Sequence, residues 1–298
     1  MTDTSPDPGP EAGPEAGADA APPESPTTPL WAKLGNIIAA PGEVFDEIRS
    51  LPVVTANWLV PTLLVLVAGW VGLWLVFQQD SIDQQISDMQ EQQIQKMVES
   101  GKMSQQQADS SRAVAQKFTK VGKIVGGIAG SGLTTFISLF WWALVLWLVG
   151  GKIMGGGFTY LKAIEAAGLA SVILLLETVV RNLLQITCGS LFAGPNLALF
   201  VVDEFHQSSL GALLTPVASL LPESARWADY DIKDLKLQVL AAFDGMVFWG
   251  LFVKSVALSR LSGRGLGPAL AWIVGLWLAV TSLMMTVGYA MQRLFAGG

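Results

Sequence analysis

The segment WLVPTLLVLVAGWVGLWLVF, residues 58–77, contains no charged side chain and consists almost entirely of large apolar residues. An α-helix rises about 1.5 Å per residue, so roughly 20 such residues cover the ~30 Å hydrocarbon core of a bilayer. A helix also satisfies its own backbone hydrogen bonds, as the lipid interior requires. The segment therefore predicts a transmembrane helix.

Four further segments are long and apolar enough to cross the membrane with it. Residues 124–150 and 266–291 are uncharged, whereas residues 161–183 and 238–258 are of similar length and carry a few charges. We therefore expect an all-α fold, a polytopic bundle of five transmembrane helices within residues 58–293.

Composition supports this class and excludes others. Charged residues make up 14% of the chain, compared with about 25% in soluble domains. Residues 1–30 hold six acidic and no basic side chains and so account for the whole net charge of −6. The remainder is balanced, and no basic surface for nucleic acid is expected. A single cysteine excludes an intramolecular disulfide and a cysteine-based metal cluster.

The chain before the first span divides into two parts. Residues 1–30 are rich in proline, alanine and acidic residues, so we expect a disordered tail that is not a signal peptide. In residues 31–57, apolar side chains recur at three- and four-residue intervals around Pro41. This pattern predicts two short amphipathic helices at the interface. They either dock a partner or the membrane surface, or pack as a lid against the bundle.

Residues 78–123 are polar, and Ser104 with Gln107 resembles a capping box. They predict an extramembrane helical hairpin, which either grips a partner or serves as a connector. Residues 185–222 are apolar but broken by glycine and proline. We expect interfacial or partly re-entrant helices there, with two extra spans as the alternative.

Motifs for catalysis or cofactor binding are lacking in the sequence. His206 is the only histidine, and with Asp203 and Glu204 it gives too few ligands of the right kind for a typical divalent metal site. There is no HExxH, GxSxG, Walker A or dinucleotide fingerprint. We therefore expect no catalytic residues, no metal and no cofactor.

Basic residues predict the orientation. The loop between the last two predicted spans carries Lys254, Arg260 and Arg264 and no acid, which places it in the cytoplasm. Five spans then give a cytoplasmic N-terminus. Four basic residues near the end of the polar hairpin oppose this assignment, and the reverse orientation is the alternative.

Charged residues within predicted spans are candidate functional residues, because charge is costly at membrane depth. Glu177 and Arg181 have the spacing of a helical ion pair near one end of the third span, and we expect a structural pair at the interface, with a functional site as the alternative. Lys162 with Glu165 caps the other end of the span in the same way. Asp244 has no partner nearby in sequence. It is either an intramembrane proton or cation site or an acid at the end of a helix.

Gly126 and Gly130 form a GxxxG pair in the second predicted span. Small residues allow close helix packing within lipid. We expect the pair to pack against a neighbouring helix of the same chain rather than in a dimer.

The stretch APGEVFDEIRSLPVVTANWLVPTLLVLV, residues 40–67, resembles the start of the YIP (Ypt/Rab-interacting protein) domain in its bacterial branch. Pro41, Phe45 and Ile48 match a Pro-x-x-x-Phe-x-x-Ile element that precedes the first span of that family. The resemblance makes these three residues candidates for docking a partner.

The segments FTYLKAIEAAGLASV (158–172) and FDGMVFWGLFVKSVALSRLSG (243–263) are similar to the third and fourth spans of the same family. The resemblance covers residues 35–292 and includes no catalytic signature. It implies a five-span bundle with a cytoplasmic N-terminus. The motif of the eukaryotic relatives that engage Rab-type GTPases is absent, so GTPase binding is not carried over.

Together these features predict a non-enzymatic integral membrane scaffold, adaptor or bilayer-organising protein of the bacterial cytoplasmic membrane. Its expected partners are the lipid bilayer, other membrane or peripheral proteins, and further copies of itself. The alternative is a component of a transporter or permease, which the broken segment 185–222 and Asp244 favour.

Overall fold

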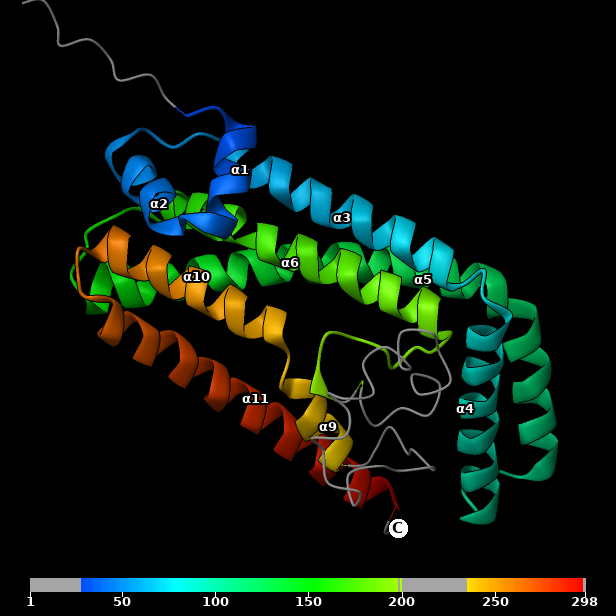
Figure 1. Cartoon of the computed structure of the whole chain (residues 1–298). Helices are drawn as coiled ribbons and strands as arrows, with labels where there is room; N and C mark the ends of the chain where they lie inside the picture. Colours follow the sequence, from blue (N-terminus) through cyan, green and yellow to red (C-terminus); the bar gives the residue numbers. More distant parts are fainter. Residues whose placement is uncertain (1–27, 198, 200–234, 297–298) are drawn as a thin grey trace, which may run out of the picture.

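The computed structural model is all-helical over the residues that it describes (Figure 1), which are 28–197, 199 and 235–296. The tail expected over residues 1–30 falls almost wholly outside these ranges. His206 with its acidic neighbours, and most of the segment 185–222, also lie outside the described residues.

Five long helical units run along the bundle: α3 (Ala56–Val76), α5 (Gln105–Val145) continued by the π-helix η1 (Leu146–Ile153), α6 (Tyr160–Cys188), α10 (Gly245–Ser262) and α11 (Leu266–Ala296). The shorter helices are α1 (Leu30–Ala39), α2 (Pro41–Ser50), α4 (Asp80–Glu99) and α9 (Leu235–Ala242).

Four of these helices contain a stretch long and apolar enough to cross a membrane: Ala56–Val76, Val125–Ile153, Tyr160–Cys188 and Leu266–Met291. The chain therefore has the character of a multi-pass helical membrane protein. The fourth expected span, residues 238–258, is not a continuous helix. Asp244 divides it between α9 and α10, because its carboxylate caps the start of α10. The remaining 18 residues of α10 include Lys254 and Arg260, which lower its apolar character.

Helix α6 is the centre of the bundle and packs against α3, α5 and α10. In its most apolar stretch 56% of the residues are buried, compared with 6% in α11. Close packing is possible because small side chains line α6. A Cβ atom on Gly168 would clash with the backbone of Trp58 in α3. The residues of α6 are therefore positioned by contacts on several sides.

Helices α1 and α2 cover one end of the bundle (Figure 1). Phe45 and Ile48 are 0% and 1% exposed and belong to the main core cluster. Pro41 is the first residue of α2 and is partly buried. In this arrangement α2 is packed on the bundle, and the side chains of Phe45 and Ile48 are not exposed to a partner.

The polar hairpin is formed by α4 and the first part of α5 (Figure 1). Ser104 accepts a hydrogen bond from the backbone N–H of Gln107, whose side chain accepts in return from the backbone N–H of Ser104. This capping box satisfies two otherwise unpaired donors at the start of α5. The candidate span in α5 begins at Val125, so the hairpin lies before it.

The expected packing of Gly126 and Gly130 differs from the observed one. No atom lies within 4 Å of a Cβ atom placed on either glycine, and both are exposed. The contact with α3 is made by Gly127, whose added Cβ would clash with Leu73. Gly126 and Gly130 lie on one face of α5, but α3 packs against the adjacent face, which carries Gly127.

Candidate functional site

The three candidate intramembrane residues meet at the second half of α6. The Nη2 group of the Arg181 guanidinium donates to Glu177 Oε1 at 2.8 Å and to Asp244 Oδ2 at 3.0 Å. The first contact is the ion pair that the sequence indicated. The second joins residues 63 positions apart, and no sequence spacing could predict it. Because α6 continues to Cys188, this cluster lies farther from the helix end than expected.

Asp244 acts as the N-cap of α10. Its Oδ1 accepts hydrogen bonds from the backbone N–H groups of Met246 and Val247 at 2.8 and 3.3 Å. Its Oδ2 accepts from Arg181, and the side chain is 2% exposed. Both oxygens are thus occupied. The geometry is that of an acid that starts a helix and anchors an arginine.

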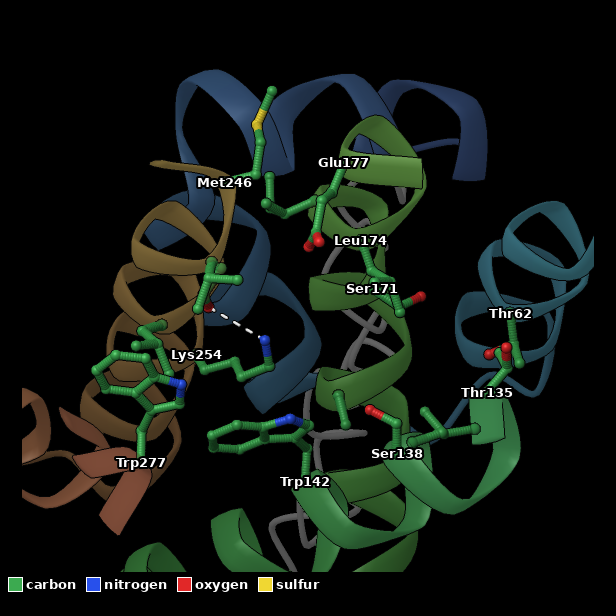
Figure 2. Close-up of a pocket in the computed structure, with 16 residues that line it drawn as sticks. Thr62, Thr135, Ser138, Trp142, Ser171, Leu174, Glu177, Met246, Lys254 and Trp277 are labelled. Atoms are coloured by element: carbon green, nitrogen blue, oxygen red, sulfur yellow. Dashed lines mark hydrogen bonds between the residues drawn. The ribbon is translucent and has the colours of Figure 1, made fainter. Parts of the chain in front are cut away.

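A cavity of about 240 Å³ lies beside this cluster, between α3, α5, α6, α10 and α11 (Figure 2). Two charged side chains, Glu177 and Lys254, line it. The apolar part of the wall includes Trp142, Leu251 and Trp277. A cavity with convergent polar groups and an apolar wall is the usual form of a small-molecule site.

Lys254 is the residue that the sequence reasoning missed, because it was assigned to the cytoplasmic loop. Its ammonium lies 4.8 Å from the ring centroid of Trp142 and makes only a long hydrogen bond, 3.4 Å, to the carbonyl of Gly250. It forms no ion pair with a carboxylate in the described part of the chain, although Glu177 is close enough to attract it. The signal was its place between Val253 and Val256 in an apolar run.

The hydroxyl groups around the cavity are of two kinds. Those of Thr62, Thr135 and Ser171 donate to carbonyls of their own helices, at distances between 2.6 and 2.8 Å. The Ser138 hydroxyl makes no hydrogen bond within residues 28–197, 199 and 235–296. Figure 2 shows Ser138 on the same side of the cavity as Trp142. Ser138 is therefore a free donor toward any bound molecule.

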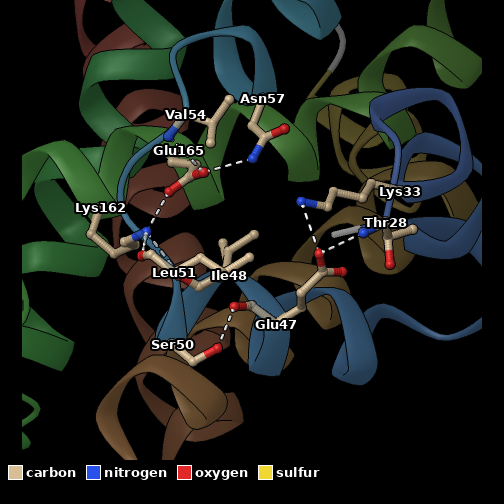
Figure 3. A network of polar contacts seen from close by, with 10 residues as sticks. All are labelled: Thr28, Lys33, Glu47, Ile48, Ser50, Leu51, Val54, Asn57, Lys162 and Glu165. Carbon is tan, nitrogen blue, oxygen red and sulfur yellow. Dashed lines mark hydrogen bonds and ion pairs between the residues drawn. The ribbon is translucent and has the colours of Figure 1, made fainter. Parts of the chain in front are cut away.

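The other end of α6 carries Lys162, which is buried (Figure 3). Its ammonium donates to the carbonyls of Ile48 and Leu51 at 2.7 and 2.8 Å, and to Glu165 Oε2 at 2.7 Å. All three donors of the ammonium are used. Lys162 therefore ties the loop after α2 to the start of α6.

Glu165 completes this second network and is 0% exposed. Its Oε1 accepts from the backbone N–H of Val54 at 3.1 Å and from the side-chain amide of Asn57 at 2.6 Å. We expect the pair Lys162–Glu165 at the interface from the sequence, but it is buried, and α1 and α2 pack over this part of α6. The network fixes the path of the chain into α3.

Metal binding finds no support in the described residues, where no group of three His, Cys, Asp or Glu side chains is placed to hold an ion. Glu177 and Asp244 are instead bound by Arg181. Comparison of the chain with protein-family models, curated proteins and solved structures gave no match. The resemblance to the YIP domain family accordingly stays an expectation drawn from the sequence pattern.

Proposed function

We propose that this protein is a non-enzymatic membrane scaffold or adaptor of the YIP-domain type. It crosses the bacterial cytoplasmic membrane five times with its N-terminus in the cytoplasm, and its partners are lipid, other membrane or peripheral proteins, or further copies of itself. The observation that carries this proposal is a preformed polar arm, the α4–α5 hairpin, joined to an apolar bundle.

Charged contacts hold the two helices of the arm together. Arg112 donates to both oxygens of Glu91, at 3.0 and 2.6 Å, and to Asp109 at 2.8 Å. The hydrogen bonds from Arg112 hold the pKa of Glu91 below its ordinary value of 4.5. Bidentate pairs of this kind fix orientation as well as contact. The two helices of the arm therefore present a surface of fixed shape.

The base of the arm is also fixed to the bundle. The side-chain amide of Gln85 donates to the carbonyl of Gly189 at 2.9 Å, and its oxygen accepts from the N–H of Leu191 at 3.1 Å. These contacts join α4 to the loop that follows α6. An arm held in one direction loses less entropy on binding a partner than a flexible loop does, and this supports an adaptor role.

The position of α10 supports a fifth span. Its first residues contact Arg181 through Asp244, while at its other end Arg260 pairs with Asp46 of α2 at 3.1 Å. The Arg264 side chain then donates to the carbonyl of Met154 at 3.0 Å. Helix α10 thus runs antiparallel to α6 along the bundle. Its 18 residues cover about 27 Å at 1.5 Å per residue.

Cysteine labelling of intact cells tests this topology in a Cys188→Ser background. Ser100 and Gly265 are both exposed. With five spans and a cytoplasmic N-terminus, an impermeant maleimide should label Ser100→Cys and not Gly265→Cys. Labelling of both positions would show that α10 does not cross the membrane. Labelling of Gly265→Cys alone would reverse the orientation.

The adaptor role predicts protein contacts at the arm. A photo-crosslinking amino acid in place of Gln93, which is exposed on α4, should yield discrete protein adducts in native membranes. The same amino acid in place of Leu64, 40% exposed on the apolar helix α3, should yield lipid adducts. No protein adduct from several exposed arm positions would contradict the proposal.

A transporter component is the second candidate, and the cavity that contains Lys254 favours it. Buried ionisable groups mark ion and proton paths in membrane proteins. Proteoliposomes with an internal pH-sensitive dye should then show proton movement that Lys254→Met abolishes. Equal dye responses from the two proteins and from empty vesicles would remove this candidate.

A further inference from the structure

We propose that the cavity beside α6 binds a small zwitterionic ligand, with the anionic group of the ligand on Lys254 and its cationic group on Glu177. This binding site goes beyond the adaptor role and does not depend on it. Figure 2 shows both side chains directed into the space between α6 and α10.

Each charged side chain is held in place and keeps unused bonding capacity. Trp142 and the carbonyl of Gly250 position the Lys254 ammonium. Arg181 occupies Oε1 of Glu177, and Oε2 makes no hydrogen bond within the described residues. Lys254 and Glu177 do not pair directly, although both are long. A ligand with two opposite charges fits between them.

The charge balance of the site favours a ligand with no net charge. The cluster contains two acids, Glu177 and Asp244, and two bases, Arg181 and Lys254, so its formal charges cancel. A simple anion or cation would leave one excess charge where water is scarce, which is costly. A zwitterion gives each spare group a partner and adds no net charge.

The size and walls of the cavity limit the ligand further. A cavity of about 150 Å³ is large enough to bind benzene, so about 240 Å³ suits an amino-acid-sized molecule or a lipid headgroup. The apolar wall of Trp142, Leu251 and Trp277 suits a short apolar group beside the charges. The free hydroxyl of Ser138 adds a donor for a carboxylate or phosphate oxygen. The shared chemistry is an ammonium linked to a carboxylate or phosphate.

Thermal unfolding of the full-length protein in a nonionic detergent tests this inference with matched probes. L-leucine carries both charges, whereas isocaproate is leucine without its amino group and isoamylamine is leucine without its carboxyl group. Dihexanoyl phosphatidylethanolamine represents a zwitterionic lipid, and dihexanoyl phosphatidylglycerol is its anionic control. Because a ligand that binds only the folded state raises the unfolding temperature, the zwitterions should raise Tm and the singly charged probes should not.

The soluble and lipid probes distinguish the two sources of the ligand. A response to L-leucine identifies a solute site, and a response to phosphatidylethanolamine alone identifies a headgroup site. In both cases Lys254→Met and Glu177→Gln should abolish the shift. Lys152→Met is the matched control, because Lys152 also lies over a tryptophan ring, 5.1 Å from the centroid of Trp147, but is exposed outside the cavity.

Ser138→Ala keeps every charge, so it tests the site even if Lys254→Met or Glu177→Gln fails to fold. Removing one hydrogen bond to a charged group, worth about 1.5 kcal/mol or more, should weaken zwitterion binding at least about tenfold. The proposal is overturned if no zwitterion raises Tm, or if a singly charged probe raises Tm as much as the zwitterion that it matches. It is equally overturned if the shift persists in Lys254→Met.

Discussion

The start and the second half of α6 each carry a basic and an acidic residue, but their surroundings differ. At the first end, Lys162 and Glu165 use all their bonding capacity on each other, on three backbone groups and on Asn57. In the second half, Glu177 lies beside a cavity that it shares with Lys254. The first network is closed, and the second has free donors and acceptors.

The backbone explains this difference. At the first end α2 stops and a loop follows, so the carbonyls of Ile48 and Leu51 and the N–H of Val54 are available to bind buried charges. Around the cavity the walls are helices, whose backbone groups already bond to one another. The Lys254 ammonium there makes only a long hydrogen bond to the backbone, to the carbonyl of Gly250 at 3.4 Å, within the described residues. Closed networks stabilise the fold, whereas spare bonding capacity at a cavity is available for a ligand.

The largest effect is expected from breaking the closed network. Lys162→Met leaves Glu165 buried without its ion pair and removes three hydrogen bonds, so stability should fall by about 3–5 kcal/mol. Thermal unfolding in detergent measures the loss. Arg260→Met, which breaks a pair that is about half exposed on both sides, is the control and should cost far less. Equal losses of stability would show that the buried network contributes no more to stability than the half-exposed ion pair of Arg260.

A smaller effect is expected at the cavity end. Asp244→Ala removes both the cap of α10 and the contact with Arg181, and should cost about 1–2 kcal/mol. Asp244→Asn keeps a good N-cap and should recover much of that loss, because Glu177 still binds Arg181. Thermal unfolding of the two variants measures the difference. If both variants lose as much stability as Lys162→Met, the charged cluster beside the cavity contributes as much to stability as the network of Lys162 and Glu165.

The arm offers a third set of charges, exposed to water, whose effect depends on pH. The hydrogen bonds from Arg112 lower the pKa of Glu91. The contribution of Glu91 to the stability of the arm is therefore complete at a pH above its ordinary pKa of 4.5. It is lost as pH falls through the depressed value. Spin labels in place of Gln92 and Ser110, both exposed, should report a broader distance distribution at low pH.

Arg112→Gln is the control for the arm, since it should broaden the same distribution at neutral pH and reduce its change with acid. The bundle, whose core is a cluster of apolar side chains, should stay folded over the pH range in which the arm loosens. Simultaneous unfolding of arm and bundle would contradict this separation.

The smallest effect is expected on the outer face of α5. Gly130→Leu should leave thermal stability unchanged, because no atom lies within 4 Å of its Cβ position. Gly127→Leu is the matched variant and should be destabilising, because Leu73 occupies that space. A large loss for Gly130→Leu in detergent would mean that this face is covered, contrary to its exposure here.

Part of the site was predictable and part was not. Glu177 and Arg181 share a helix, so their four-residue spacing was enough to predict the ion pair. Asp244 was recognised as an isolated acid, but its partner lies on another helix. Lys254 was visible as a charge in an apolar run and was assigned to the adjacent loop. Position along one helix follows from sequence, whereas position between helices depends on how they rotate and pack.

The sequence by itself determined that the chain is a helical membrane protein, because the length and apolar character of each segment decide how it partitions into lipid. It also determined the polar hairpin and the capping box at Ser104, which are local features. Only the tertiary structure decided which charges meet and which glycine packs. It also decided that Phe45 faces the core and that Lys254 faces a cavity. Those outcomes depend on contacts between distant segments, which no local pattern contains.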